Sequence, residues 1–195
     1  MTPGASEPPA ASEPQSTQRL FFALWPDEAA RRGLSAATAK AVRRCGGRPV
    51  PAANLHVTLV FLGSVAQRRI AQLQDIARER AATFAQEEPL SLTFGRLAHW
   101  SRSQILCNLA TEESAAALAL AESLKDAVAA AGFTPDLKPF HAHVTVARKV
   151  LRAAELPAVT PVVWRFADFA LVDSHTARSG PIYSVIESYP LVKSD

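Results

Sequence analysis

The sequence predicts a fold of mixed helices and strands, built from two similar halves that meet at a central groove. The first observation is a repeated motif. HVTL at 56–59 is followed by a near copy, HVTV, at 143–146. The second is that each half has the order strand, helix, motif strand, with similar spacing, which indicates an internal duplication. The third is size: 195 residues, 48% of them hydrophobic, suffice for one core of ordinary volume.

The first half has clear element boundaries. A dense apolar run at 19–25 has the length of a strand and ends at Pro26. Asp27 is the expected N-cap of a helix that reaches about residue 44, where two glycines stop it. The first motif lies in a strand at 55–62, and apolar residues at helical intervals predict a second helix at 65–87.

The second half continues the alternation. Strands are expected at 90–94 and 104–109, followed by an Ala- and Leu-rich helix at 113–131. The second motif lies in a strand at 140–149. Further strands at 162–172 and 183–188 are expected at the periphery of the sheet.

The composition limits the class of protein. Residues 1–17 carry too few apolar side chains to offset their ordering entropy, so we expect a disordered tail followed by one domain at 18–195. No apolar run is long enough for a membrane span and no secretory signal is evident, which favours the cytoplasm. The net charge of +3 suits a small anion or an RNA end without requiring either. Cys45 and Cys107 stand alone and are expected to be buried or idle thiols.

The repeated motif carries the candidate chemistry. In a strand, residues i and i+2 share a face, so His56 lies beside Thr58 and His143 beside Thr145. A single such pair is common on half-buried strands. Two pairs at one groove, however, supply an acid, a base and two hydroxyl donors for opening a phosphodiester without metal.

The other histidines give a competing interpretation. His141 shares a face with His143 if the strand extends that far, and with His56 it would give three imidazoles, which makes a zinc site arguable. No Asp, Glu or Cys stands at a companion spacing, so a metal-free site is favoured. His99 and His175 occur in turn-rich sequence and are expected at the surface.

Three further residues depend on geometry. Arg148 lies five positions after His143, so an unbroken strand would direct it to the opposite face, and a functional role requires a bulge or an earlier strand end. Phe22 and Trp25 could offer a face to a nucleobase, although aromatic residues in a first strand are more often core.

The motifs and their flanks resemble a known family. The segments 19–24 (RLFFAL), 47–63 (GRPVPAANLHVTLVFLG) and 140–148 (FHAHVTVAR), with the closing GPIY at 180–183 and YPL at 189–191, are similar to the bacterial RNA 2′,3′-cyclic phosphodiesterases. These proteins, also called 2′-5′ RNA ligases, belong to the two-histidine phosphoesterase superfamily. The likeness runs from about residue 19 to 191. Ala142 and Val146 replace the more frequent proline and leucine.

The resemblance implies a bilobal α+β fold, each lobe an antiparallel sheet flanked by helices, with the site in the central cleft. It implies metal-free hydrolysis of a terminal 2′,3′-cyclic phosphate to a 2′-phosphate, without a cofactor. By position, His56 would be the proton donor and His143 the proton acceptor. The implied substrate contacts are Thr58, Thr145, Arg148 and Phe22.

Two alternatives remain open from the sequence. Ligation of 2′,3′-cyclic phosphate and 5′-hydroxyl ends uses the same chemistry in reverse, and a binding module without turnover would keep the same cleft. The substrate could be a tRNA fragment, another RNA end or a small cyclic nucleotide. We expect a monomer, because no large apolar stripe remains after the core is assigned.

Overall fold

The structure is a computed structural model that describes residues 16–153, 155–177 and 180–193. Most of the expected tail therefore lies outside the described residues. Its last two residues are ordered: Thr17 begins the first strand and pairs with Ala66, and the backbone oxygen of Ser16 accepts a hydrogen bond from Gln67 N at 3.0 Å. The first described strand thus begins two residues before the apolar run at 19–25.

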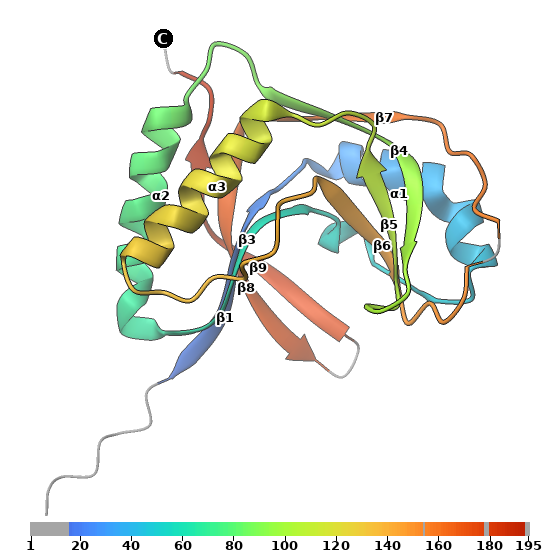
Figure 1. The fold of residues 1–195 in the computed structure, drawn as a ribbon, viewed down its shortest axis with the longest axis horizontal. Helices are drawn as coiled ribbons and strands as arrows, with labels where there is room; N and C mark the ends of the chain where they lie inside the picture. The colour runs from blue at the N-terminus through green and yellow to red at the C-terminus, as the bar shows by residue number, and fades with distance from the viewer. Residues whose placement is uncertain (1–15, 154, 178–179, 194–195) are drawn as a thin grey trace, which may run out of the picture.

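Two antiparallel sheets form the framework, as the resemblance implied (Figure 1). The first sheet has the order β3 (Val57–Ala66), β1 (Thr17–Leu24), β8 (Asp168–Ala177), β9 (Gly180–Pro190). The second has the order β2 (Arg48–Pro49), β6 (His143–Arg148), β5 (Ile105–Ala110), β4 (Leu90–Trp100), β7 (Val162–Phe166). Each motif strand pairs with the strand that precedes it in the predicted repeat, β3 with β1 and β6 with β5, which agrees with a duplicated unit.

The described residues form the α-helices α1 (Glu28–Arg44), α2 (Ile70–Phe84) and α3 (Ala115–Ala130), with short 3-10 turns at η1 (Ala52–Asn54) and η2 (Gln67–Arg69). The predicted cap is confirmed, because the Asp27 carboxylate accepts from Ala30 N at 2.7 Å. The two halves exchange their helices (Figure 1): α1 packs against β6 and β7, whereas α3 packs against β3 and α2. This exchange ties the two sheets together.

One continuous apolar core joins the two sheets to their helices, and β1 shows how its residues are selected. Leu20, Phe22 and Leu24 point into this core, while Phe21 and Ala23 point to the opposite face and form a smaller cluster there. No helix among residues 16–153, 155–177 and 180–193 is long and apolar enough to cross a membrane.

The C-terminal region differs from the prediction. The single strand expected at 162–172 is two strands, divided at Ala167, and they enter different sheets. As predicted, β7 and β9 lie at sheet edges, but β8 lies inside the first sheet, between β1 and β9. The sequence does not show where the chain passes from one sheet to the other, because residues buried in either sheet have the same apolar composition.

Two histidines lie in strands rather than in turns. His99 belongs to β4 and is half-buried, with Nε2 2.9 Å from the backbone oxygen of Val150, so the expectation of a surface position was wrong for it. His175 belongs to β8 and is exposed as predicted, with its ring 2.7 Å from the Asp173 carboxylate.

Candidate active site

A β-bulge in β6 decides which side chains face the groove. Leu106 pairs with Ala147 and the next residue, Cys107, pairs with Thr145, so Val146 is an extra residue. Val146 and Ala147 are consequently both buried. The bulge resets the alternation, and Arg148 joins the face of its own motif pair. This is the condition that the sequence set for a functional role of Arg148.

The first motif contains the matching bulge. Phe22 pairs with Val60 and Ala23 with Thr58, which leaves Leu59 as the extra residue. As a result Phe61, five positions after the motif histidine, faces the same groove as Thr58. The two halves therefore place Phe61 and Arg148 at equivalent positions.

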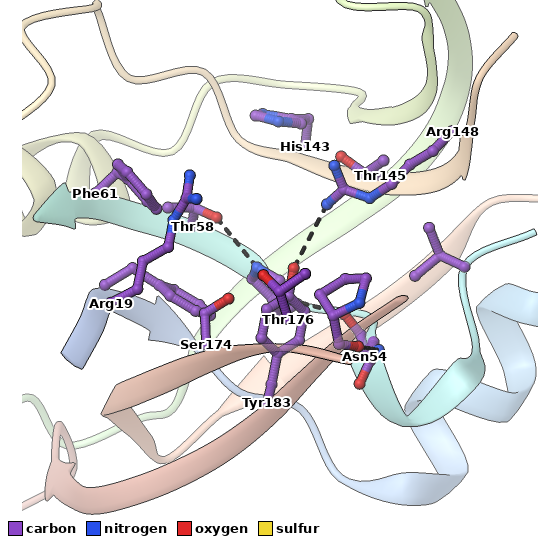
Figure 2. A pocket seen from close by; sticks show the side chains of 14 residues that line it. Arg19, Asn54, Thr58, Phe61, His143, Thr145, Arg148, Ser174, Thr176 and Tyr183 are labelled. Carbon is purple, nitrogen blue, oxygen red and sulfur yellow. Dashed lines mark hydrogen bonds between the residues drawn. The ribbon is translucent and has the colours of Figure 1, made fainter. Parts of the chain in front are cut away.

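Both motifs line one cavity of about 330 Å³ between the two sheets (Figure 2). His56 and Thr58 enter it from the first sheet, and His143 and Thr145 enter from the second. Arg148 lies at the same wall as Thr145. Among the described residues, the cavity lining contains no Asp, Glu or Cys. Its charge and hydrogen-bonding capacity are those of an anion site.

Hydrogen bonds fix the orientation of the His56 ring. Nδ1 lies 2.8 Å from the backbone oxygen of Asn54, which only accepts, so Nδ1 carries the proton of the neutral ring. Nε2 is then the acceptor, and Thr58 donates its hydroxyl to it at 3.1 Å. The ring packs against three aromatic side chains, Phe21, Trp25 and Tyr183, at centroid distances of 4.9, 5.4 and 5.2 Å. His56 thus presents Nε2 to the cavity from a rigid support.

His143 repeats this arrangement. Its Nδ1 donates to the backbone oxygen of His141 at 2.7 Å, again the residue two positions earlier. Its ring packs against Trp100 with centroids 4.6 Å apart. Within the described residues its Nε2 atom has no hydrogen-bond partner, so it can accept a proton.

The site favours neutral imidazoles. Burial lowers the pKa of His56 to about 4, assisted by repulsion from Arg148, from His143 when it is protonated and from Arg31, and opposed by the hydrogen bond to Asn54. Burial also lowers the pKa of His143, assisted by His141 and opposed by donation to the His141 oxygen. In the ligand-free protein at neutral pH, both Nε2 atoms are therefore unprotonated acceptors.

Arg148 and Tyr183 close one side of the cavity. Arg148 Nη2 donates to the Tyr183 hydroxyl at 3.5 Å (Figure 2). Tyr183 in turn packs edge-on against the His56 ring. A guanidinium held beside two imidazoles and two threonine hydroxyls matches the oxygens of a phosphate group.

Known proteins resemble this chain over most of its length. The model of the 2′-5′ RNA ligase superfamily matches residues 25–178. A Thermus thermophilus protein named RNA 2′,3′-cyclic phosphodiesterase is 31% identical over 186 residues, covering 89% of this chain and 90% of the relative. An Escherichia coli protein of the same name is 31% identical over 185 residues, covering 93% and 99%. This chain belongs to the 2′-5′ RNA ligase superfamily.

Solved structures extend the likeness to the fold. E. coli LigT complexed with 3′-AMP superposes with a TM-score of 0.81 at 28% identity, covering 91% of this chain and 100% of that one. LigT complexed with ATP gives a TM-score of 0.76 at the same identity, with 91% and 99% covered. The superfamily member described here is thus an enzyme of the cyclic phosphodiesterase or 2′-5′ ligase type.

The structure contradicts the position expected for Phe22. Its side chain is fully buried on the core face of β1 and packs against Phe169 at a centroid distance of 6.0 Å. The neighbouring Phe21 faces the cavity instead, because side chains alternate along the strand. Trp25 does not line the cavity but stacks on the His56 ring. The Arg31 Cζ atom lies 4.6 Å from the centroid of the Trp25 ring, a cation–π contact.

The arguable zinc site is not assembled. His141 lines a second cavity with Trp100 and Phe140, away from His56. Among the described parts of the chain, no three side chains of His, Cys, Asp or Glu come together as a metal cluster. Cys107 is buried as predicted, and burial raises the pKa of its thiol to about 12.

Sequence reasoning assigned no role to several residues that line the cavity. Two of them lie in segments that carry the resemblance, Arg19 in RLFFAL and Tyr183 in GPIY. Phe61 could have been found from its place five positions after His56, which matches Arg148 in the second motif. Ser174 and Thr176 carry no sequence signal beyond alternation in a strand.

Proposed function

We propose that the protein hydrolyses the 2′,3′-cyclic phosphate at an RNA end to a 2′-phosphomonoester, without a metal ion. The observation that supports this most is the pair of imidazole and hydroxyl groups facing one cavity with Arg148. All of these groups suit a phosphate, and the lining offers no carboxylate or thiolate as an anionic metal ligand among the described residues.

In this reaction His143 Nε2 accepts a proton from water as the water oxygen attacks phosphorus. The bond from phosphorus to O3′ breaks, and His56 Nε2 returns a proton to O3′, which leaves the phosphate on O2′. The Nδ1 hydrogen bonds to Asn54 and His141 support these roles, because they direct both Nε2 atoms to the cavity. Thr58, Thr145 and Arg148 donate to the non-bridging oxygens.

The proton donor must be charged before it acts. With its pKa lowered to about 4, His56 is neutral in the free protein at pH 7. A bound phosphate places a negative charge beside Arg148, which offsets one of the charges that hold the His56 pKa down. Substrate binding therefore raises the pKa of His56 and favours its protonated form, which acts as the acid.

This gives a predicted pH dependence. The profile of kcat/KM reports the free protein, so its optimum is expected below pH 6.5, between the lowered pKa values of His56 and His143. The rate falls at higher pH as His56 loses its proton, and at lower pH as His143 gains one. The profile of kcat is expected to extend to higher pH, because bound phosphate raises the His56 pKa. Initial rates from pH 4 to 9 measure both. A kcat/KM that stays constant through pH 8 would exclude His56 as the acid.

The direct test uses the purified protein, EDTA and an oligoribonucleotide with a 2′,3′-cyclic phosphate end. We expect a 2′-phosphomonoester as the product, identified by its resistance to hydrolysis by a 3′-specific phosphatase and by phosphorus NMR. A 3′-phosphomonoester as the product would show that O2′, rather than O3′, is the leaving group. Activity that disappears in EDTA and returns with added zinc would replace the two-histidine mechanism.

Two alternatives give different results in the same experiment. Ligation requires a 5′-hydroxyl strand held in place of water, since only proximity overcomes the concentration of water. Adding such a strand should therefore yield little joined product. Binding without turnover would indicate a module for RNA ends. A monomeric state and a cytoplasmic location remain predictions.

A further inference from the structure

Arg19 is a cationic side chain in the cavity that the proposed reaction does not use. It lies on the cavity face of β1, two residues before Phe21, and on the opposite side of the cavity from Arg148 (Figure 2). Its Cζ lies 5.0 Å from the ring centroid of Phe61, a cation–π contact that holds the guanidinium in place. Within residues 16–153, 155–177 and 180–193, Arg19 forms no ion pair. Its charge is available to a ligand.

The internal symmetry relates Arg19 to Arg148. Phe61 occupies the position in the first half that Arg148 occupies in the second. Because Arg19 contacts Phe61, the first half also has a guanidinium beside its motif, as the second half has with Arg148. The cavity therefore has one arginine on each side of the two motif pairs, although a cyclic phosphodiester carries only one negative charge.

Two hydroxyls extend the polar wall away from the reacting centre. Ser174 and Thr176 lie on β8, on the same face as Arg19. Thr58 pairs with Ala23, and Ala23 pairs with Ala170 on the other side of β1. Thr58 and Ala170 therefore lie at the same level of the sheet. Ser174 is four residues after Ala170, which places it about 13 Å from that level along the strand direction, at about 3.3 Å per residue. One phosphate cannot contact both Thr58 and these hydroxyls, so this part of the cavity fits a longer ligand.

We propose that Arg19, with Ser174 and Thr176, binds the phosphate on the 5′ side of the terminal nucleotide. This proposal rests on the proposed function, and it makes the preferred substrate an RNA chain rather than a nucleoside cyclic phosphate. In an RNA end that carries a 2′,3′-cyclic phosphate, the 5′ phosphate is the next anion along the chain. A guanidinium fork and two hydroxyls donate hydrogen bonds to such a phosphate.

The test compares two substrates that differ by one phosphate, adenosine 2′,3′-cyclic phosphate and its 5′-phosphorylated form. For the unaltered protein we expect kcat/KM to be about tenfold or more higher for the 5′-phosphorylated substrate, because hydrogen bonds to charged groups are the stronger class. Arg19→Gln should remove this preference and leave the rate on the unphosphorylated substrate nearly unchanged. Arg19→Lys should keep part of the preference, since it keeps the charge.

The matched control is Arg165→Gln, an exposed arginine on β7 outside the cavity lining, which should keep the full preference. An equal loss on both substrates in Arg19→Gln would overturn the proposal and assign Arg19 to the reacting phosphate. No preference in the unaltered protein would also overturn it. If neither substrate is hydrolysed, the proposed function fails separately. Calorimetric dissociation constants of the same two ligands, for the unaltered protein and for Arg19→Gln, then decide the role of Arg19.

Discussion

Replacing His56 or His143 with alanine is expected to lower kcat/KM for a 2′,3′-cyclic phosphate end by about 10²- to 10⁴-fold, the range for loss of one general acid or base. Each ring presents Nε2 to the cavity through an Nδ1 hydrogen bond to a backbone oxygen. No other described side chain in the lining can easily replace it, because the remaining groups are hydroxyls, arginines, an amide and apolar side chains. Steady-state rates on the oligoribonucleotide measure the loss.

The control variant is His175→Ala, since His175 is exposed on β8 and outside the cavity lining. It should keep the full rate. Thermal unfolding followed by circular dichroism should show all three variants folded. The double variant of His56 and His143 should lose less than the product of the two single losses, because the two proton transfers belong to one reaction. A single variant with nearly full activity would contradict the acid and base pairing.

The repeated motif made much of this fold predictable. An imidazole and a hydroxyl at i and i+2 share a face in any strand, so the pairing of His56 with Thr58 needed no tertiary information. The duplicated order of strand, helix and motif strand also predicted that the motif strands meet at one cavity, and both motifs line it.

The sequence predicted the helices and strands better than it predicted which of them pack against each other. The apolar positions of α1, such as Leu34 and Val42, identify the face that is buried, but that face would fit either sheet. The exchange of α1 and α3 between the halves therefore has no local signal. The same limit applies to the apolar run at 162–172, whose two parts enter different sheets.

Alternation fails as a guide where both faces of a strand are apolar. Phe21 and Phe22 are adjacent, and both are buried, one toward the cavity and one toward the core. Composition gives no preference between them, and it was the resemblance that implied Phe22 as the substrate contact. The spacing of Arg148 from His143 indicated that a functional role would require a bulge or an earlier strand end. The structure contains a bulge there, and the consecutive apolar pair Val146 and Ala147 agrees with it.

Arg148→Gln is expected to lower kcat/KM by about 10²- to 10³-fold, the effect of removing one preorganised donor from a developing negative charge. The bulge at Val146 brings the guanidinium to the face of His143 and Thr145, and Tyr183 holds it at 3.5 Å. Arg148→Lys should recover only part of the rate, because an ammonium cannot make the two parallel hydrogen bonds of a guanidinium. Arg152→Gln is the matched control, an exposed arginine outside the cavity lining.

The pH profile separates this role from a structural one. Arg148 is one of the charges that lower the pKa of His56, so its removal should raise that pKa. The alkaline limb of kcat/KM in Arg148→Gln should therefore move to higher pH while the maximum rate falls. A mere loss of folding would lower the rate without moving the limb. A reduced rate with an unchanged limb, in a variant shown to be folded, would contradict electrostatic coupling between Arg148 and the acid.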